Sequence, residues 1–363
     1  MKVRLDKSVF TNATDEMRQQ ELNFLLNIIV YKDRYKLMVS DAEVLDSDGF
    51  STLTQIEKKI IEEGLIDSIT GSLTSADCEV AENGNAEDDL KIFTPEEAII
   101  YLLQPLSIIL ENGLNDAHFM KAVFRWFDPT GELTRRVDEG WIRFENAGGC
   151  SNVRNFLTAR INVYGGRRKF LNSYVLLDGD RRYPSDAEPE KKYRKLKETL
   201  NAWGVGCHEL EKRCMENYMP DEAMNAFATA ETQAWITAYH TLTAEQKDCY
   251  NIAEGFAKDI SKEQNREVKR KESLLRTKDL RLRRVSYVRG FLPNEEKTFY
   301  TSVSKGNFLH LEHGLPVRNF KVIFPEKYGD NTVTYRANML SRTSHQKDPL
   351  ELEHIVSGIR SMI

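Results

Sequence analysis

Residues 174–180 read Tyr174-Val175-Leu176-Leu177-Asp178-Gly179-Asp180, an apolar run followed directly by two aspartates around a glycine. Four consecutive apolar residues are typical of a strand covered on both faces, as strands of parallel sheets are. Functional side chains of such sheets gather at the carboxyl ends of the strands. The segment therefore predicts a parallel α/β layer with Asp178 and Asp180 at its functional edge.

The segments on either side complete this layer. Residues 141–144 predict a short strand, Ser151 or Asn152 caps a following helix, residues 190–203 predict a charged helix, and residues 205–210 predict another strand. Strands that alternate with helices indicate a parallel sheet with right-handed crossovers. We expect an α/β fold in which a parallel sheet is flanked by helices, with a mainly helical C-terminal extension and a mixed N-terminal region.

Upstream of the layer, Thr94-Pro95-Glu96-Glu97 predicts the start of a helix. Thr94 suits the N-cap, Pro95 the first helical position, and Glu97 completes a capping box. We expect this helix to run toward Leu110 and to end near Asn112-Gly113.

Charge divides the chain unevenly. Residues 1–118 hold 10 Lys and Arg against 23 Asp and Glu, whereas residues 119–363 hold 41 against 33. A basic balance lowers the electrostatic cost of approaching a polyanion, and an acidic one suits a protein partner, although both can be ordinary solvated surfaces. We expect an acidic region over 1–135 that could bind a partner, a catalytic layer over 136–230, and a basic, mainly helical region over 231–363.

Composition narrows the class of protein. The chain has 363 residues, a net charge of -5 and 40 % hydrophobic residues, which suffices for a substantial core. No run approaches the roughly 18 apolar residues of a membrane span, and no apolar secretory segment follows the N-terminal charges. Five cysteines without a CxxC pair favour neither a disulfide framework nor a zinc ribbon. These features predict a cytoplasmic protein that does not enter a membrane.

Carboxylates suggest the chemistry of the layer. Glu145 directly follows the strand predicted over 141–144, as Asp178 and Asp180 follow theirs. Adjacent parallel strands would bring the three carboxylates to one edge, where their mutual repulsion calls for a hard cation. Mg²⁺ takes oxygen ligands and is commonly held by carboxylates together with substrate phosphate. A glycine between the aspartates lets both side chains face the same ion.

The order of apolar strand, Glu145, Gly148-Gly149 turn, helix, apolar strand and Asp178-x-Asp180 resembles the Toprim domain of topoisomerases, primases and OLD-family nucleases. The later segment Leu210-Glu211-Lys212-Arg213-Cys214-Met215-Glu216-Asn217-Tyr218-Met219-Pro220 resembles a stretch of the stand-alone, OLD-like Toprim group. That group includes the nuclease subunit of the PARIS anti-phage system, which works beside a separate ABC-type ATPase. The resemblance covers about residues 138–230, so the catalytic layer over 136–230 would be Toprim-like.

This resemblance implies a metal-dependent endonuclease that cuts DNA or RNA such as tRNA. Glu145 would be the Toprim glutamate and Asp178 and Asp180 the metal-binding pair, with Glu216 as a further ligand and Lys212 as the cation that stabilises phosphoryl charge. Mg²⁺ or Mn²⁺ would be the cofactor, with two ions expected. Asn146 follows Glu145 where the family has glycine.

The resemblance also implies partners. The chain would be the effector of a prokaryotic anti-phage system, activated by a partner ATPase of the ABC or OLD type, and it could form a homodimer. The sequence has no GxxxxGK[ST] motif, so a nucleotide-driven step would require another chain.

Arginines suggest where nucleic acid would bind. Arg181 and Arg182 stand beside the aspartates, and paired arginines commonly bind phosphate. Arg281, Arg283 and Arg284 could follow a nucleic-acid backbone, or could belong to a solvated helix face.

Simpler interpretations remain open for the other candidates. The Asp-Gly-Asp segment can be an ordinary turn, Glu216 can belong to a helix cap, and Lys212 can be a solvated lysine. Two other functions also remain: a non-catalytic Toprim-like scaffold that binds an ATPase or nucleic acid, and a Toprim enzyme of replication or repair. Convergence of Glu145 with Asp178 and Asp180 within metal-bridging distance would favour catalysis, whereas their divergence would argue against it.

Overall fold

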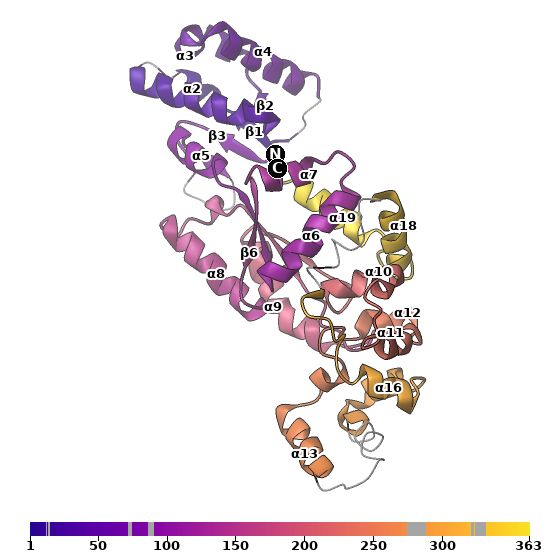
Figure 1. Cartoon of the computed structure of the whole chain (residues 1–363). Coiled ribbons are helices and arrows are strands. Elements are labelled where there is room, and N and C mark those ends of the chain that lie inside the picture. The colour runs from indigo at the N-terminus through magenta and orange to yellow at the C-terminus, as the bar shows by residue number, and fades with distance from the viewer. Residues whose placement is uncertain are drawn as a thin grey trace.

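The computed structural model describes residues 1–11, 13, 15–71, 75–85, 91–273, 288–320, 323 and 332–363. Its strands form two four-stranded sheets, and every strand pair in them is parallel. The two sheets follow one another along an elongated molecule, and both chain ends lie at the junction between them (Figure 1). The N-terminal region predicted as mixed is thus an α/β unit of its own.

The first sheet has the strand order β2-β1-β3-β4. Its strands are β1 (Lys2–Leu5), β2 (Lys36–Val39), β3 (Cys78–Val80) and β4 (Ile92–Phe93). Its helices are α1 (Lys7–Thr11), α2 (Glu16–Val30), α3 (Asp48–Thr52), α4 (Gln55–Ile69) and α5 (Pro95–Leu102), with the 3-10 turns η1 (Tyr31–Asp33) and η2 (Ala42–Asp46).

Helix α5 begins as predicted but ends earlier. Thr94 and Glu97 form the expected capping box, and Pro95 occupies the first turn. The helix stops at Leu102, and strand β5 (Leu106–Leu110) follows, so the predicted continuation to Leu110 is wrong. Pro105 explains the break, because proline has no N–H to donate and disfavours helical geometry in the residue before it.

The second sheet has the strand order β6-β5-β7-β8. It contains β5, β6 (Ile142–Asn146), β7 (Ser173–Leu177) and β8 (Gly206–Glu209). Its neighbouring helices are α6 (Gly113–Phe127), α7 (Glu132–Asp138), α8 (Cys150–Val163) and α9 (Glu188–Ala202), with the 3-10 turn η3 (Arg168–Phe170). The predicted parallel sheet flanked by helices is confirmed.

The predicted domain boundary at 135/136 cuts through this second unit. Strand β5 is central in the sheet and pairs with both β6 and β7. The chain passes from the first sheet to the second between Leu102 and Leu106. The division therefore lies about 30 residues earlier than the predicted one, because residues 106–110 form a strand and not the end of a helix.

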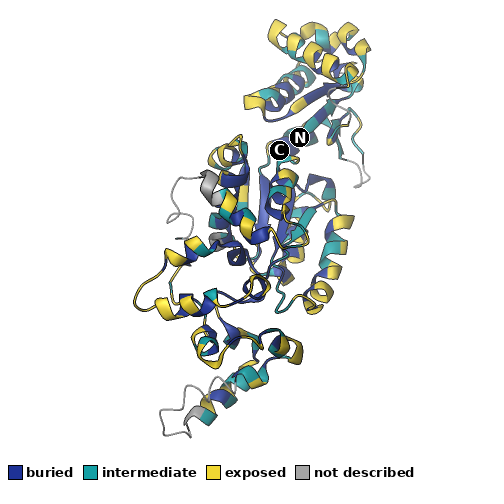
Figure 2. Cartoon of the chain, turned by 90° about the vertical axis from the view of Figure 1, so that its right-hand side faces the viewer, coloured by how far each residue is buried: buried dark blue, intermediate teal, exposed yellow. Residues whose placement is uncertain are grey.

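Two apolar cores cover the faces of the second sheet. Ile109, Val175 and Leu177 pack with residues of α8 and α9 on one face. Ile108 and Leu176 pack on the other face with α6 and with helices from the end of the chain. Buried residues accordingly run through the strands, while the outer helix faces are exposed (Figure 2).

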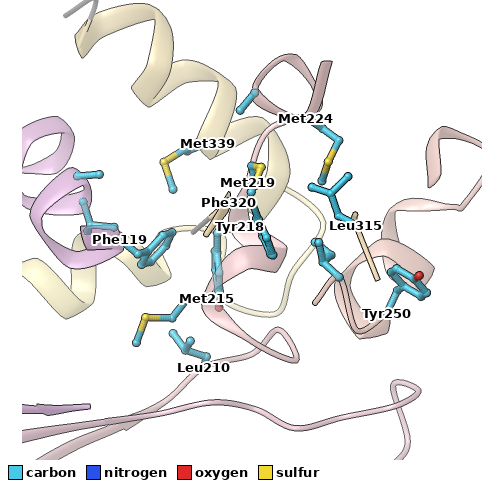
Figure 3. Packing of buried hydrophobic residues seen from close by; sticks show 14 of the residues in the cluster. Phe119, Leu210, Met215, Tyr218, Met219, Met224, Tyr250, Leu315, Phe320 and Met339 are labelled. Atoms are coloured by element: carbon cyan, nitrogen blue, oxygen red, sulfur yellow. The ribbon is translucent and has the colours of Figure 1, made fainter. Parts of the chain in front are cut away.

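Beyond the second sheet, the described residues form helices and 3-10 turns. These are η4 (Met215–Tyr218), α10 (Asp221–Asn225), α11 (Gln233–His240), α12 (Ala244–Cys249), η5 (Phe256–Asp259), α13 (Lys262–Ser273), α15 (Asn294–Phe299), α16 (Lys305–Leu311), α18 (Thr332–Thr343) and α19 (Glu351–Arg360). Phe119 of α6, Tyr218 of η4 and Met339 of α18 meet in one buried cluster (Figure 3). The end of the chain thus completes the core of the second sheet.

In the part of the chain that the structure describes, every helix is too short or too polar to cross a membrane.

Candidate functional site

The carboxyl edge of the second sheet brings two chain segments together. β5 ends at Leu110 and continues into Glu111, while β7 ends at Leu177 and continues into Asp178. The two strands are direct neighbours, with Ile109 opposite Val175. Because they are parallel, Glu111 and the Asp178-Gly179-Asp180 loop leave the sheet side by side.

Glu111 is enclosed by donors from three segments. The backbone N–H of Cys150 donates to Glu111 Oε2 at 3.3 Å, and the backbone N–H of Asp178 also binds this carboxylate. The Tyr193 hydroxyl lies 3.3 Å from Glu111 Oε1. Burial raises the pKa of the Glu111 carboxyl, and the negative charge of Asp180 raises it further.

Asp180 faces the same hydroxyl. Its Oδ2 accepts a hydrogen bond from Tyr193 at 2.6 Å and an ion pair from Lys192 Nζ at 2.7 Å. Glu111 Oε1 and Asp180 Oδ2 are therefore at most 5.9 Å apart, since both contact one oxygen atom. Partial burial lowers the pKa of Lys192, but the hydrogen bond to Asp180 outweighs it and holds that pKa above its usual value.

A glycine is required in the loop between the two aspartates. The N–H groups of Gly179 and Asp180 donate to the carbonyls of Lys212 and Arg213, at 3.1 and 2.9 Å. A Cβ on Gly179 would lie 2.3 Å from the Lys212 carbonyl oxygen and 2.4 Å from that of Leu210. The loop is thus clamped against the segment after β8, which only glycine allows.

A second close approach fixes the start of α6. A Cβ on Gly113 would lie 2.7 Å from Asn146 Cβ and 2.9 Å from Asn146 Cα. The helix that follows Glu111 can therefore start beside the end of β6 only because residue 113 is glycine. This packing holds Glu111 at the edge of the sheet.

Glu145 does not belong to this site. β5 separates β6 from β7, so the expected adjacency of their ends is wrong. The Glu145 backbone is level with Val175, which puts its Cα about 14 Å from that of Asp178 on standard strand spacings. Its carboxylate pairs at 2.9 Å with Arg160, whose other end reaches Ser173 at the start of β7. The side chain therefore points toward the amino edge.

Lys212 is also engaged elsewhere. Its side chain is 1 % exposed, pairs with Asp248 and donates to the Arg342 carbonyl at 2.9 Å. Arg342 and His345 contact the same Asp248 carboxylate, at 2.9 and 2.6 Å. The main chain of Lys212 binds the Asp-Gly-Asp loop, whereas its ammonium group is held by Asp248 and Arg342.

Glu216 lies within η4, where its side chain is 4 % exposed. Its neighbour Asn217 donates to the carbonyls of Lys247 and Tyr250, at 2.7 and 2.8 Å, which fixes the turn against α12. Glu216 is therefore part of a packed 3-10 turn, and the helix-cap interpretation does not hold because Pro220 is the N-cap of α10.

The predicted phosphate-binding arginines are partly explained by ion pairs. Arg181 binds Glu209 at 3.2 Å, and Arg182 binds Asp186 through two nitrogens, at 2.8 and 3.3 Å. Arg182 thus stabilises its own loop. Arg281, Arg283 and Arg284 lie outside the described residues.

Few side-chain oxygens at this edge of the sheet are arranged so that they could bind a metal ion. Among the described residues, no group of three or more His, Cys, Asp and Glu side chains is arranged to hold a metal ion. The two carboxylates that meet on Tyr193, with Asp178 beside them, form the arrangement closest to such a site at this edge. Two carboxylates together with substrate phosphate are sufficient for Mg²⁺ in many proteins.

The residues before Glu111 contain a sequence signal for its position at the sheet edge. Leu106 to Leu110 follows a proline and is apolar except for Ser107, which is close to the pattern that predicts a buried strand over residues 174–177. Reading it as strand would have placed Glu111 and Gly113 directly at a carboxyl edge.

Comparisons with known proteins do not decide the family: no family model, no curated protein and no solved structure matches the chain.

Proposed function

We propose that the chain is a metal-dependent nuclease of the Toprim type, in which Glu111 takes the place expected of Glu145. The observation that carries the proposal is the meeting of Glu111 and Asp180 on the Tyr193 hydroxyl, at the carboxyl edge of a parallel sheet. The motif of strand, glutamate, glycine, helix and later Asp-x-Asp is retained with Glu111 and Gly113, and its two strands are then neighbours.

The residues at this edge fit a hard divalent cation. Two carboxylates no more than 5.9 Å apart repel one another, and this repulsion adds to the burial that raises the pKa of Glu111. The ammonium group of Lys192 already forms an ion pair with Asp180, so this carboxylate lies next to a positive charge. Glu111 and Asp180, together with a phosphate oxygen of the substrate, would hold Mg²⁺ or Mn²⁺, both of which prefer oxygen ligands.

When bound, the metal would stabilise phosphoryl charge and lower the pKa of a coordinated water. The chain's own groups would prepare the site for that chemistry. Tyr193 holds Glu111 and Asp180 in place, and the backbone N–H of Cys150 orients the second Glu111 oxygen. Lys192 is exposed, so its ammonium can exchange Asp180 for a phosphate oxygen of an incoming substrate.

The substrate and partners follow from the family resemblance. The substrate would be DNA or an RNA such as tRNA, and the chain would act as the effector of an anti-phage system beside a separate ATPase. The absence of a GxxxxGK[ST] motif from the sequence supports a division of labour between two chains.

The experiment is cleavage of plasmid DNA and of total tRNA by the purified chain, with and without Mg²⁺ or Mn²⁺. Glu111→Gln and Asp180→Asn should each lower the rate by about 100-fold or more, the scale of losing a catalytic group that cannot be replaced. Glu198→Gln, on an exposed position of α9, is the matched control and should cleave like the wild type. Glu145→Gln should lose far less activity than Glu111→Gln.

Other outcomes would redirect the assignment. Loss of cleavage in Glu145→Gln with full activity in Glu111→Gln would contradict the site. If neither substrate is cut but calorimetry shows Mg²⁺ binding that Glu111→Gln abolishes, a nuclease gated by its partner ATPase remains. With neither cleavage nor metal binding, the non-catalytic scaffold replaces the nuclease.

A further inference from the structure

The amino end of the second sheet has a polar row on a face that is otherwise apolar. Ser107 lies opposite both Arg143 and Ser173 in the strand register. Both serines are 1 % exposed, although the next residues along the same face are the core residues Ile109 and Val175. Central strands of buried parallel sheets are normally apolar throughout, so two adjacent buried hydroxyls require a reason.

Helix α8 places an ion pair over this row. Arg160 donates to Glu145 at 2.9 Å and reaches the Ser173 hydroxyl at 3.5 Å. Arg143 extends from the edge strand β6 and is exposed. Two guanidinium groups and one carboxylate therefore converge on the row, which leaves it with a net positive charge.

These groups line a cavity of about 240 Å³ at the junction of the two units. Tyr164 and Phe170 are also part of its lining, and their rings stack at 4.9 Å. Gln104, from the connection between the sheets, contributes a buried Nε2 with no hydrogen-bond partner in the described part of the chain. A buried donor without a partner is unfavourable, and an oxygen-rich occupant would supply the missing acceptor.

We propose that this cavity binds a phosphate monoester of a small polyol or nucleoside. The phosphate is recognised by Arg143 and Arg160, and the serine hydroxyls and the Gln104 amide complete its hydrogen bonds. Glu145 supplies the acceptor for a sugar hydroxyl. The volume is below the roughly 300–1,000 Å³ of pockets for larger organic ligands, so the occupant is small.

The cavity is independent of the proposed nuclease site. It lies at the amino ends of β5 and β7, whereas Glu111 and Asp178 follow the carboxyl ends of the same strands. Ligand binding in the cavity therefore does not depend on catalysis at that edge.

The test is isothermal titration calorimetry of the full chain with ribose 5-phosphate, AMP, ribose and inorganic phosphate. At least one of the two esters should bind, and ribose should not. Arg143→Gln should weaken ester binding by about tenfold or more, because a charged hydrogen bond is lost. Ser107→Ala, which removes one buried hydroxyl, should weaken it severalfold. Arg154→Gln, on an exposed position of α8, is the matched control and should bind like the wild type.

Circular dichroism of each variant separates loss of a ligand group from loss of the fold. Tighter binding of AMP would identify a nucleotide, and tighter binding of ribose 5-phosphate would identify a sugar phosphate. The proposal is overturned if neither ester binds at millimolar concentration, if inorganic phosphate binds as tightly as the esters, or if folded Arg143→Gln binds like Arg154→Gln.

Discussion

Gly179 is the residue on which the geometry of the candidate site depends most directly. In Gly179→Ala the new methyl group would collide with two backbone carbonyls, of Lys212 and Leu210, neither of which can rotate away. We expect a loss of about 1–3 kcal/mol in the free energy of unfolding, as for other overpacked positions. Metal-dependent cleavage should fall as well, because the loop carries both aspartates.

Urea denaturation measures the stability change. Gly290→Ala is the control, since a Cβ at Gly290 meets nothing within 4 Å. Equal stability of the two alanine variants would contradict this expectation. It would show that the backbone after β8 can move away from the new methyl group at little cost.

The buried lysine Lys212 should make the stability of the protein depend on pH. Burial lowers its pKa to about 8, against the opposing charge of Asp248, while Arg342 lowers it further. In the unfolded chain the lysine keeps its proton up to about pH 10.4. Between these values the unfolded state binds more protons than the folded state, so the stability contributed by this group rises with pH.

We therefore expect the wild type to gain about 1 kcal/mol per pH unit over Lys212→Met between pH 8 and 9.5. Lys212→Met keeps Arg342 and His345 as partners of Asp248, so it should still fold. Chemical denaturation at several pH values gives the difference. Parallel stability curves for the two proteins would mean that Lys212 does not titrate in this range.

At the scale of elements, α19 is an internal part of the second sheet's core although it ends the chain. Leu352, Ile355, Val356 and Ile359 are all at most 2 % exposed and pack in the cluster that includes α6. Glu351, at 0 % exposed, accepts from Tyr218 and from the Glu211 N–H at 2.8 Å. The helix is held by both its apolar face and its first turn.

Ile355→Ala should therefore lower the free energy of unfolding by about 2–5 kcal/mol, through lost burial and the cavity left behind. Thermal unfolding followed by circular dichroism measures the effect. Val163→Ala, at the exposed end of α8, provides the comparison and should change stability little. A similar, small shift in both variants would show that α19 does not support the core.

At the scale of the whole molecule, the second unit inserts a side chain into the first. Phe170 belongs to the turn before β7, but it is 1 % exposed and packs in the core of the first sheet, edge-on to Phe93 with ring centroids 5.4 Å apart. Next to it, Lys169 donates to the carbonyls of Asn85 and Ile92 and to Glu97. Turn η3 thus joins the two units.

Phe170→Ala should cost about 3–5 kcal/mol, with the loss felt mainly in residues 1–104. Hydrogen exchange read by mass spectrometry should show faster exchange in β1, β3 and β4 than in the wild type. Phe156→Ala, half-buried on α8, should leave exchange of the first sheet unchanged. Faster exchange confined to β7 and α8 would contradict this joining role.

Several local features of this fold can be predicted from single segments of the sequence. The apolar run at 174–177, the capping box at Thr94 and the turn at Asp178-Gly179-Asp180 each depend on neighbouring residues alone, and the structure has the strand, the helix start and the loop in these places. The parallel α/β layer followed from them, because alternating strands and helices leave few other arrangements.

The composition of the candidate site depended instead on strand order. Local sequence does not determine which strands pair. Because β5 lies between β6 and β7, Glu145 is separated from Asp178, and Glu111 takes the place beside Asp178 at the sheet edge. The role of Lys212 was equally non-local, since Asp248 and Arg342 lie 36 and 130 residues away along the chain. Periodicity and caps are set within a few residues, whereas pairing and burial are set by contacts between distant segments, so only the tertiary structure could assign these side chains.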